Sequence, residues 1–176
     1  MVMIKRIQLI LVFMSIIFLS SCGKDDDANV STNTVNINGS LYDLNGGILY
    51  RKIEWQGDRY FRAFDMILYG GGIKRTASTF RGKGIIIVAR MYVIGSENYM
   101  DDGHYVFGVT PKPITFSRVG YATNFDVASN DNDPLIPLDS GFMNVRWENQ
   151  HTIDFDIRNN NGDVLIGSFY DDMIIR

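Results

Sequence analysis

Regular alternation of apolar and polar side chains near the end of the chain is the feature that most narrows its fold. Apolar residues occupy every second position of 143–147 and, after a turn at 149–150, of 153–157. The apolar positions are Met143, Val145, Trp147, Ile153, Phe155 and Ile157. Successive side chains of a β-strand point to opposite faces, so this period of two predicts strands with one dry face and one wet face. With further strands at 164–170 and 173–176, the pattern predicts an antiparallel meander.

Turn residues divide the earlier part of the chain into more strands. Asn38-Gly39 tolerates positive φ at both centres of a type I′ turn, which predicts an opening hairpin with strands at 34–37 and 41–44. Gly46-Gly47 is expected to break the chain after that hairpin. Gln56-Gly57-Asp58 then predicts the turn of a second hairpin.

The segment from Gly84 to Ile94 predicts a long central strand. It is dense in Ile and Val, whose branched Cβ atoms restrict χ1 in a helix and pack well on a pleated sheet. The glycines at 70–72 and 82–84 do not open a helix with the spacing of a phosphate-binding loop, so we interpret them as turns or bulges. A turn at 101–103 leads into a short strand at 104–109.

These elements define an all-β fold class. No strand alternates with a long segment of helical period, so parallel βαβ units are not expected. Antiparallel strands with one apolar face must close on themselves or pack as two sheets, because an open sheet exposes its dry face. We favour an antiparallel β-sandwich or flattened β-barrel, and a closed lipocalin-like (calycin) barrel is the alternative.

The amino terminus has the layout of a secretory signal. Lys5 and Arg6 precede an almost continuous apolar run from residue 7 to 19, and that run of about 13 residues is shorter than the roughly 20 needed to cross a bilayer. The following Leu19-Ser20-Ser21-Cys22 resembles the lipobox of bacterial lipoproteins. The resemblance implies that Cys22 is the lipid attachment site and that residues 1–21 are a signal peptide. There are two weaker alternatives. One is a conventional signal peptide that leaves Cys22 as a free cysteine, and the other is a transmembrane anchor.

The residues after Cys22 predict a lipidated flexible tether at 22–33, followed by a single all-β domain at 34–176. The tether contains Lys24 followed by the acidic run 25–27 and lacks large side chains, so it cannot bury enough surface to offset its ordering entropy. This run also resembles the signal after the lipidated cysteine of many Bacteroidota lipoproteins. That resemblance implies a lipid-anchored outer-membrane protein exposed at the cell surface, with a periplasm-facing anchor as the alternative.

A broader pattern resembles small all-β Bacteroidota lipoproteins of uncharacterised function. It combines the lipoprotein signal and first hairpin with residues 46–50, the strand at 152–156, the turn at 161–162 and the strand at 166–170. The resemblance implies a displayed β domain and assigns no catalytic residue to it.

Charge and residue types narrow the possible chemistry. Without residues 1–21 the chain carries 15 basic and 20 acidic side chains, a charge of −5, which gives no electrostatic support for nucleic-acid binding. His104 and His151 lack the spacing of a zinc site, and we interpret each as a surface or turn-edge residue. No cofactor is expected. Asp131 and Asp133 offer oxygens to calcium but lack the rest of an EF-hand loop, so an Asx-rich loop is favoured.

Three hypotheses for function remain. The first is a non-enzymatic extracellular binding module for a glycan or a protein, using some of the 9 Tyr and 2 Trp residues as an exposed aromatic surface. The second is a carrier of a small apolar ligand inside a closed barrel. The third, less favoured, is a hydrolase that uses Asp154 and Asp156 as its pair of carboxylates. Alternation on a wet sheet face is the favoured explanation of these two residues. The oligomeric state stays open.

Overall fold

The computed structural model describes residues 33–77, 79–94, 99–129, 134–147 and 150–176. These residues form thirteen strands and no helix, so the all-β fold class is confirmed for the described part of the chain. The signal peptide, the lipobox and the tether up to residue 32 lie outside it. Residues 32–176 form one compact unit.

The strands vary from long, curved elements to two-residue pairs. They are β1 (Thr34–Ile37), β2 (Ser40–Gln56), β3 (Arg59–Gly71), β4 (Lys74–Arg75), β5 (Phe80–Arg81), β6 (Lys83–Tyr92), β7 (Gly103–Phe107), β8 (Thr115–Asp126), β9 (Ile136–Pro137), β10 (Ser140–Trp147), β11 (His151–Arg158), β12 (Val164–Asp171) and β13 (Met173–Ile175).

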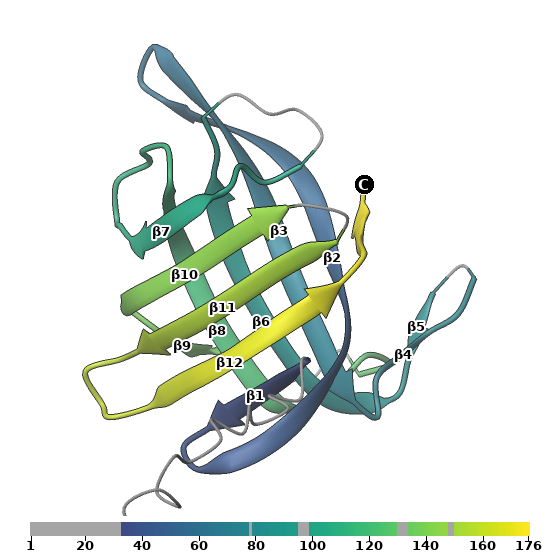
Figure 1. Cartoon of the computed structure of the whole chain (residues 1–176). Helices are drawn as coiled ribbons and strands as arrows, with labels where there is room; N and C mark the ends of the chain where they lie inside the picture. The colour runs from purple at the N-terminus through teal and green to yellow at the C-terminus, as the bar shows by residue number, and fades with distance from the viewer. Residues whose placement is uncertain (1–32, 78, 95–98, 130–133, 148–149) are drawn as a thin grey trace, which may run out of the picture. The chain divides into compact units, whose positions relative to one another are not determined.

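Hydrogen bonding between strands closes into a ring. The order is β1-β12-β11-β10-β7-β8-β6-β3-β2, and β1 also pairs with β2. Figure 1 shows β10, β11 and β12 crossing in front of β2, β3, β6 and β8. The fold is therefore a flattened barrel with two facing layers, as the sequence favoured. Closure removes sheet edges that would otherwise expose unpaired backbone groups.

The strand order differs from a simple up-and-down meander at two places. Strand β7 lies between β8 and β10 and pairs with β8 in parallel, although it precedes β8 in the chain. Strand β13 pairs in parallel with residues 47–49 of β2. The sequence predicted only antiparallel pairing. Parallel neighbours are usually joined by a helix, and the segments that join the parallel strands here carry no helical signal.

Both predicted hairpins form, with one correction. Asn38 and Gly39 have φ values of 51° and 86°, as a type I′ turn requires. Gly46-Gly47 does not break the chain: β2 is continuous from Ser40 to Gln56, with a register shift against β3 between Leu44 and Gly46. This irregularity is a β-bulge, which bends a strand without ending it. A side chain at position 46 would collide with the Tyr69 hydroxyl, so glycine permits the close approach.

The alternation predicted for the last third of the chain is confirmed. Ile153, Phe155 and Ile157 are buried, whereas the intervening positions of β11 are partly exposed. These side chains belong to one large apolar cluster in the interior of the ring, together with residues such as Phe64 and Phe116. Burial of this cluster is the main favourable term in folding.

Strand β8 has no counterpart among the sequence-based assignments. Its apolar residues do not alternate regularly, because its pairing with β6 shifts register twice and Arg118 has a φ of 50°. Each shift moves the following side chains to the other face of the strand. A period of two is therefore lost along the sequence although the strand is twelve residues long.

Candidate functional site

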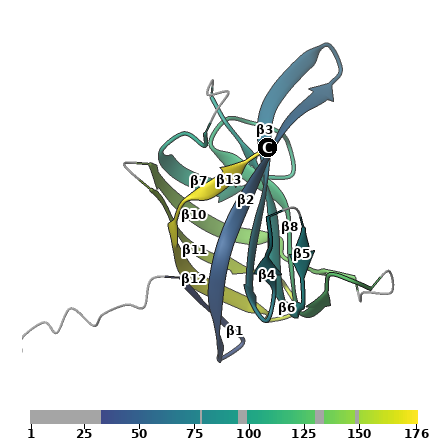
Figure 2. The same ribbon diagram turned by 90° about the vertical axis from the view of Figure 1, so that its right-hand side faces the viewer.

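The β2–β3 hairpin extends past the rest of the ring. Pairing of β3 with β6 ends at Ala63 and Tyr92, but β2 and β3 stay paired as far as Gln56 and Arg59. Figures 1 and 2 show this hairpin projecting from one end of the barrel. Its tip therefore has only its own two strands as sheet neighbours.

Large apolar side chains are exposed on this projection. Ile53, Trp55 and Tyr60 are 65%, 68% and 55% exposed. Trp55 and Tyr60 are directly opposite each other on the two strands, and their ring centroids are 5.6 Å apart at a tilt of 55°. Residues 53 and 55 have the same parity as the buried Leu49, so they continue the inward face of β2 beyond the opening of the ring.

A neighbouring loop brings further apolar side chains to this end. The Val93 amide donates to the Arg62 carbonyl on β3, and the Trp147 amide donates to a carboxylate oxygen of Asp102 at 2.7 Å. The rings of Tyr99 and Trp147 are stacked, with an interplanar angle of 5° and centroids 6.0 Å apart. We call this surface the aromatic end. Its members are Ile53, Trp55, Tyr60, Ile94, Tyr99 and Trp147.

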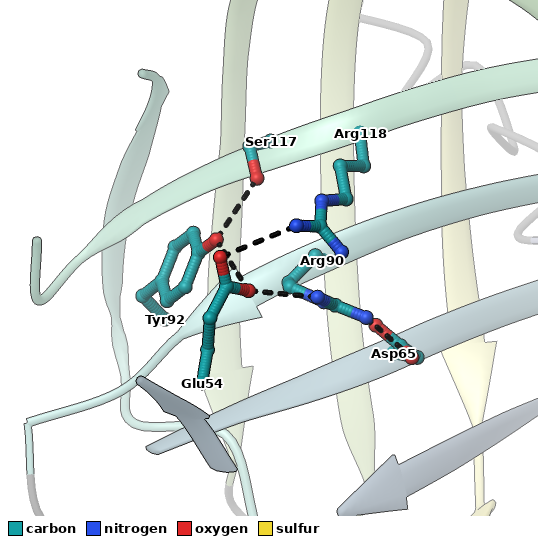
Figure 3. Close-up of polar contacts among 6 residues, drawn as sticks. All are labelled: Glu54, Asp65, Arg90, Tyr92, Ser117 and Arg118. Carbon is teal, nitrogen blue, oxygen red and sulfur yellow. Dashed lines mark hydrogen bonds and ion pairs between the residues drawn. The ribbon is translucent and has the colours of Figure 1, made fainter. Parts of the chain in front are cut away.

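A network of charged and polar side chains fixes the base of the hairpin on the outer face of the barrel (Figure 3). Arg90 of β6 donates two hydrogen bonds to Asp65 of β3, at 2.7 and 3.0 Å. Its remaining terminal nitrogen, Nη1, donates to Glu54 of β2 at 2.7 Å. The Tyr92 hydroxyl also donates to Glu54, at 3.1 Å. We call these residues, with Ser117 and Arg118 of β8, the ion network.

The ion network ends on β8 and so spans four adjacent strands. Arg118 lies 3.3 Å from the second carboxylate oxygen of Glu54, and the Ser117 and Tyr92 hydroxyls are 3.2 Å apart. Glu54 lies two residues from the end of β2, within the projecting part of the hairpin. The network thus ties the hairpin to β6 and β8, which β2 does not pair with directly.

The charges in the network are matched. Burial raises the pKa of the Glu54 carboxyl, but hydrogen bonds from Arg90 and Tyr92 and the charge of Arg118 outweigh it, and the pKa lies below its ordinary value. The hydrogen bonds to Asp65 contribute most to raising the pKa of Arg90. Burial raises the pKa of the Tyr92 hydroxyl. A carboxylate held ionised in this way is suited to positioning, because it has little tendency to take up a proton near neutral pH.

The two histidines differ from each other. His104 is exposed, as predicted, and its Nδ1 lies 2.6 Å from the Asn144 side-chain oxygen. His151 adjoins a turn, as predicted, but it is not at the surface, because it is 0% exposed. Within the described residues neither of its ring nitrogens has a hydrogen-bond partner, and burial lowers its pKa to about 4. It shares the inward face of β11 with Ile153, which explains its burial.

The two carboxylates considered for catalysis are already paired with arginines. Asp154 and Asp156 lie on the outer face of β11, each in an ion pair, with Arg146 at 3.2 Å and Arg158 at 2.8 Å. Asp131 and Asp133 lie outside the described residues. In the part of the chain that is described, no three His, Cys, Asp or Glu side chains are grouped as a metal site requires.

Comparison with known proteins adds no further identification. No family model, curated protein or solved structure matches this chain. Among the described residues there is no helix that is both long enough and apolar enough to cross a membrane.

Sequence reasoning missed the ion network and did not single out Trp55 or Tyr60. The network residues are up to 64 positions apart and meet only through strand pairing, so no local pattern reports them. A signal for the hairpin tip was present, because Trp55 and Tyr60 flank the 56–58 turn, where side chains have few neighbours to bury them.

Proposed function

We propose that this chain is a lipid-anchored protein of the bacterial cell envelope whose β domain binds a glycan or a protein outside the cell, without catalysis. The observation that carries the proposal is the aromatic end, where Trp55 and Tyr60 are 68% and 55% exposed on a projecting hairpin. Exposed aromatic side chains on a soluble domain cost solubility and are typical of binding surfaces.

The ion network supports a binding role for the hairpin. Affinity is gained when a binding surface is held in one conformation before its ligand arrives, because less entropy is lost on association. The contacts of Glu54 with Arg90 and Arg118 restrain the projecting strand on its outer face. Trp55 and Tyr60 lie on the opposite face, which continues the inner face of the barrel. The hairpin is thus a supported and exposed element.

A carrier of a small apolar ligand is a second candidate, supported by the closed ring of strands. A hydrolase based on Asp154 and Asp156 is less favoured, because each carboxylate is already paired with an arginine. The negative charge of the chain favours a ligand other than nucleic acid.

Truncation of the hairpin aromatics provides the binding test. We expect the full chain with Cys22→Ala to bind at least one member of an array of plant, host and microbial polysaccharides, or a surface protein, with no product released. Trp55→Ala and Tyr60→Ala should each weaken that binding by about tenfold or more, since truncation of a central aromatic residue commonly costs 2 kcal/mol or more.

Tyr170→Ala is the matched control, because Tyr170 is 46% exposed on β12 and outside the aromatic end. Binding is measured by isothermal titration calorimetry, and the thermal midpoints of the variants show whether folding is retained. Equal weakening by all three variants, or by Tyr170→Ala alone, would contradict the assignment of the site.

Membrane attachment is tested separately. Cys22→Ala should move the protein from the membrane fraction to the soluble fraction, because acyl chains contribute about 0.8 kcal/mol per buried methylene and no other anchor is proposed. The measurement is fractionation followed by immunoblotting, with Ser21→Ala as the control that leaves the thiol in place. A Cys22→Ala protein that stays with the membrane would refute the lipoprotein assignment. Protease accessibility on whole cells reports whether the domain faces outward.

A further inference from the structure

The outer face of the barrel carries an apolar pocket that shares no residue with the aromatic end. A cavity of about 130 Å³, open on one side, is lined by nine side chains, seven of them aliphatic or phenyl and two tyrosine. Its lining includes Ile48 of β2, Ile67 and Tyr69 of β3, Phe80 of β5 and Phe125 of β8. The polar atoms of these side chains are limited to the two tyrosine hydroxyls.

This arrangement is unusual for the outer face of a closed barrel. Leu49, Met66 and Leu68 fill the interior side of the same strands. The positions between them point outward and normally carry polar residues, but here they are apolar as well. Ile48, Tyr69 and Ile73 are at most 6% exposed and form a second, smaller apolar cluster. A fold that needed only to cover this face would fill it, since buried voids forfeit packing contacts.

A basic hairpin borders the pocket. It consists of β4, β5 and Lys83, and Figure 2 shows β4 and β5 standing in front of the sheet that contains β3 and β6. Residues 74–83 include four cations and no acid, although the chain as a whole is acidic. The cations are Lys74, Arg75, Arg81 and Lys83, and all four are exposed.

This hairpin contacts the pocket through Phe80. The Tyr69 ring packs edge-on against Phe80, with centroids 5.1 Å apart. Arg75 is directly opposite Phe80 in the β4–β5 pair, so the two side chains share one face of the hairpin. The charge of Arg75 opposes the rise that burial causes in the pKa of the Tyr69 hydroxyl. In the described residues none of the four cations takes part in an ion pair. Asp171, which also acts on Tyr69, and Asp126 are the nearby acids.

We propose that this pocket binds a small anionic amphiphile, with its apolar part between Ile67, Tyr69 and Phe80 and its carboxylate or similar anionic group on Arg75. The cavity is close to the ~150 Å³ at which an apolar protein cavity accommodates one benzene molecule. The apolar part of the ligand is therefore one ring or a short alkyl chain, and longer chains extend into solvent. Unpaired cations beside an apolar cavity complement such a molecule in both charge and polarity.

The probes are straight-chain carboxylates from butanoate to decanoate and the alcohols of equal length. The protein is the full chain with Cys22→Ala, and binding is followed by two-dimensional NMR of backbone amides. We expect saturable shifts at residues 48–50, 67–73 and 80–86. Affinity should rise about fourfold per methylene until the pocket is filled and then level off, because a buried methylene contributes about 0.8 kcal/mol. Each carboxylate should bind roughly threefold tighter than its alcohol at low salt.

Two variants separate the apolar and ionic contributions. Ile67→Phe adds a ring to the pocket and should abolish binding of both probe series. Arg75→Gln should reduce carboxylate affinity to that of the alcohols and leave alcohol affinity unchanged. Arg146→Gln removes an exposed arginine on β10 and is the control that should change neither.

Three results would overturn the proposal: no saturable shift at the pocket amides, equal affinity of carboxylates and alcohols at low salt, or unchanged binding in Ile67→Phe with an intact spectrum. Neither Trp55 nor Tyr60 takes part in this experiment. If the probes do not bind the pocket, the function proposed for the aromatic end still stands. If truncation of Trp55 and Tyr60 has no effect, the proposal for the pocket still stands.

Discussion

Replacing Arg90 by methionine lowers the free energy of unfolding by about 3 kcal/mol at pH 7. The substitution keeps the apolar part of the side chain but leaves the carboxylates of Glu54 and Asp65 without their shared cation. Removing one partner of a buried ion pair typically costs 3–5 kcal/mol, because the remaining charge is desolvated and uncompensated. The side chains of Arg90, Glu54 and Asp65 are 15%, 21% and 29% exposed, so we expect the lower end of that range.

Urea unfolding followed by tryptophan fluorescence measures this loss. Arg146→Met is the matched control, because Arg146 pairs with Asp154 at the surface and its side chain is 65% exposed. Exposed ion pairs contribute about 0.2–1 kcal/mol, so the control should change stability by less than 1 kcal/mol. Similar losses in the two variants would show that the ion network has no special structural role.

The loss caused by Arg90→Met should also depend on pH. The pKa of Glu54 is lowered in the folded protein, so its ionised form contributes stability above the unfolded-state pKa, and this contribution disappears as pH falls through the folded pKa. In the variant a protonated Glu54 no longer leaves an uncompensated charge. The difference between the two proteins should therefore shrink as the pH is lowered below the ordinary range of a carboxyl pKa. A difference independent of pH would indicate lost packing instead.

The second prediction concerns His151, whose burial makes the fold sensitive to acid. Burial lowers the pKa of its imidazole from 6.5 to about 4 in the folded protein, whereas the unfolded chain titrates at the ordinary value. Below pH 6.5 the unfolded state therefore binds more protons, and stability is lost until the folded pKa is reached. One pKa unit corresponds to about 1.4 kcal/mol, so the wild-type protein should lose about 3 kcal/mol between pH 7 and pH 4 from this group.

Other groups titrate over the same interval, so the measured quantity is the difference between the wild-type protein and His151→Leu. The variant should lack about 3 kcal/mol of the acid-induced loss, measured from urea unfolding at pH 7, 5.5 and 4. His104→Gln, which removes the exposed histidine, is the matched control. Parallel pH profiles for wild type and His151→Leu would contradict the assignment of the acid-induced loss to His151. They would mean that protonated His151 finds a partner such as Asp171, which lies opposite it on β12.

His151 also illustrates how much of this structure was available in the sequence. Its position two residues before Ile153 and four before Phe155 places it on the dry face of a strand predicted from alternation alone. From the sequence we interpret His151 as a surface or turn-edge residue, since it lacks the spacing of a zinc ligand. The positional pattern was the better guide, because the parity of a strand in regular register fixes the face of every residue in it.

For Trp55 and Glu54, by contrast, the sequence pattern did not predict the surroundings of the side chains. The hairpin that contains them follows from the turn at 56–58, but its projection beyond the ring depends on where the pairing of β3 with β6 ends. The contact of Glu54 with Arg90 joins residues 36 positions apart on strands that are not direct neighbours. Sequence analysis therefore predicted the hairpin and could not predict the supported, exposed surface at its tip.

The sequence by itself determined the all-β class, the two opening hairpins and the dry faces of β10 and β11. These depend on φ preferences at residues such as Gly39 and on the alternation of neighbouring side chains, which are local properties. Tertiary structure decided the closure of the ring through β1 and β2, the place of β7, the ion network and the outer pocket. Each of these depends on which distant strands pair and in what register, and that choice is made by the packing of the whole domain.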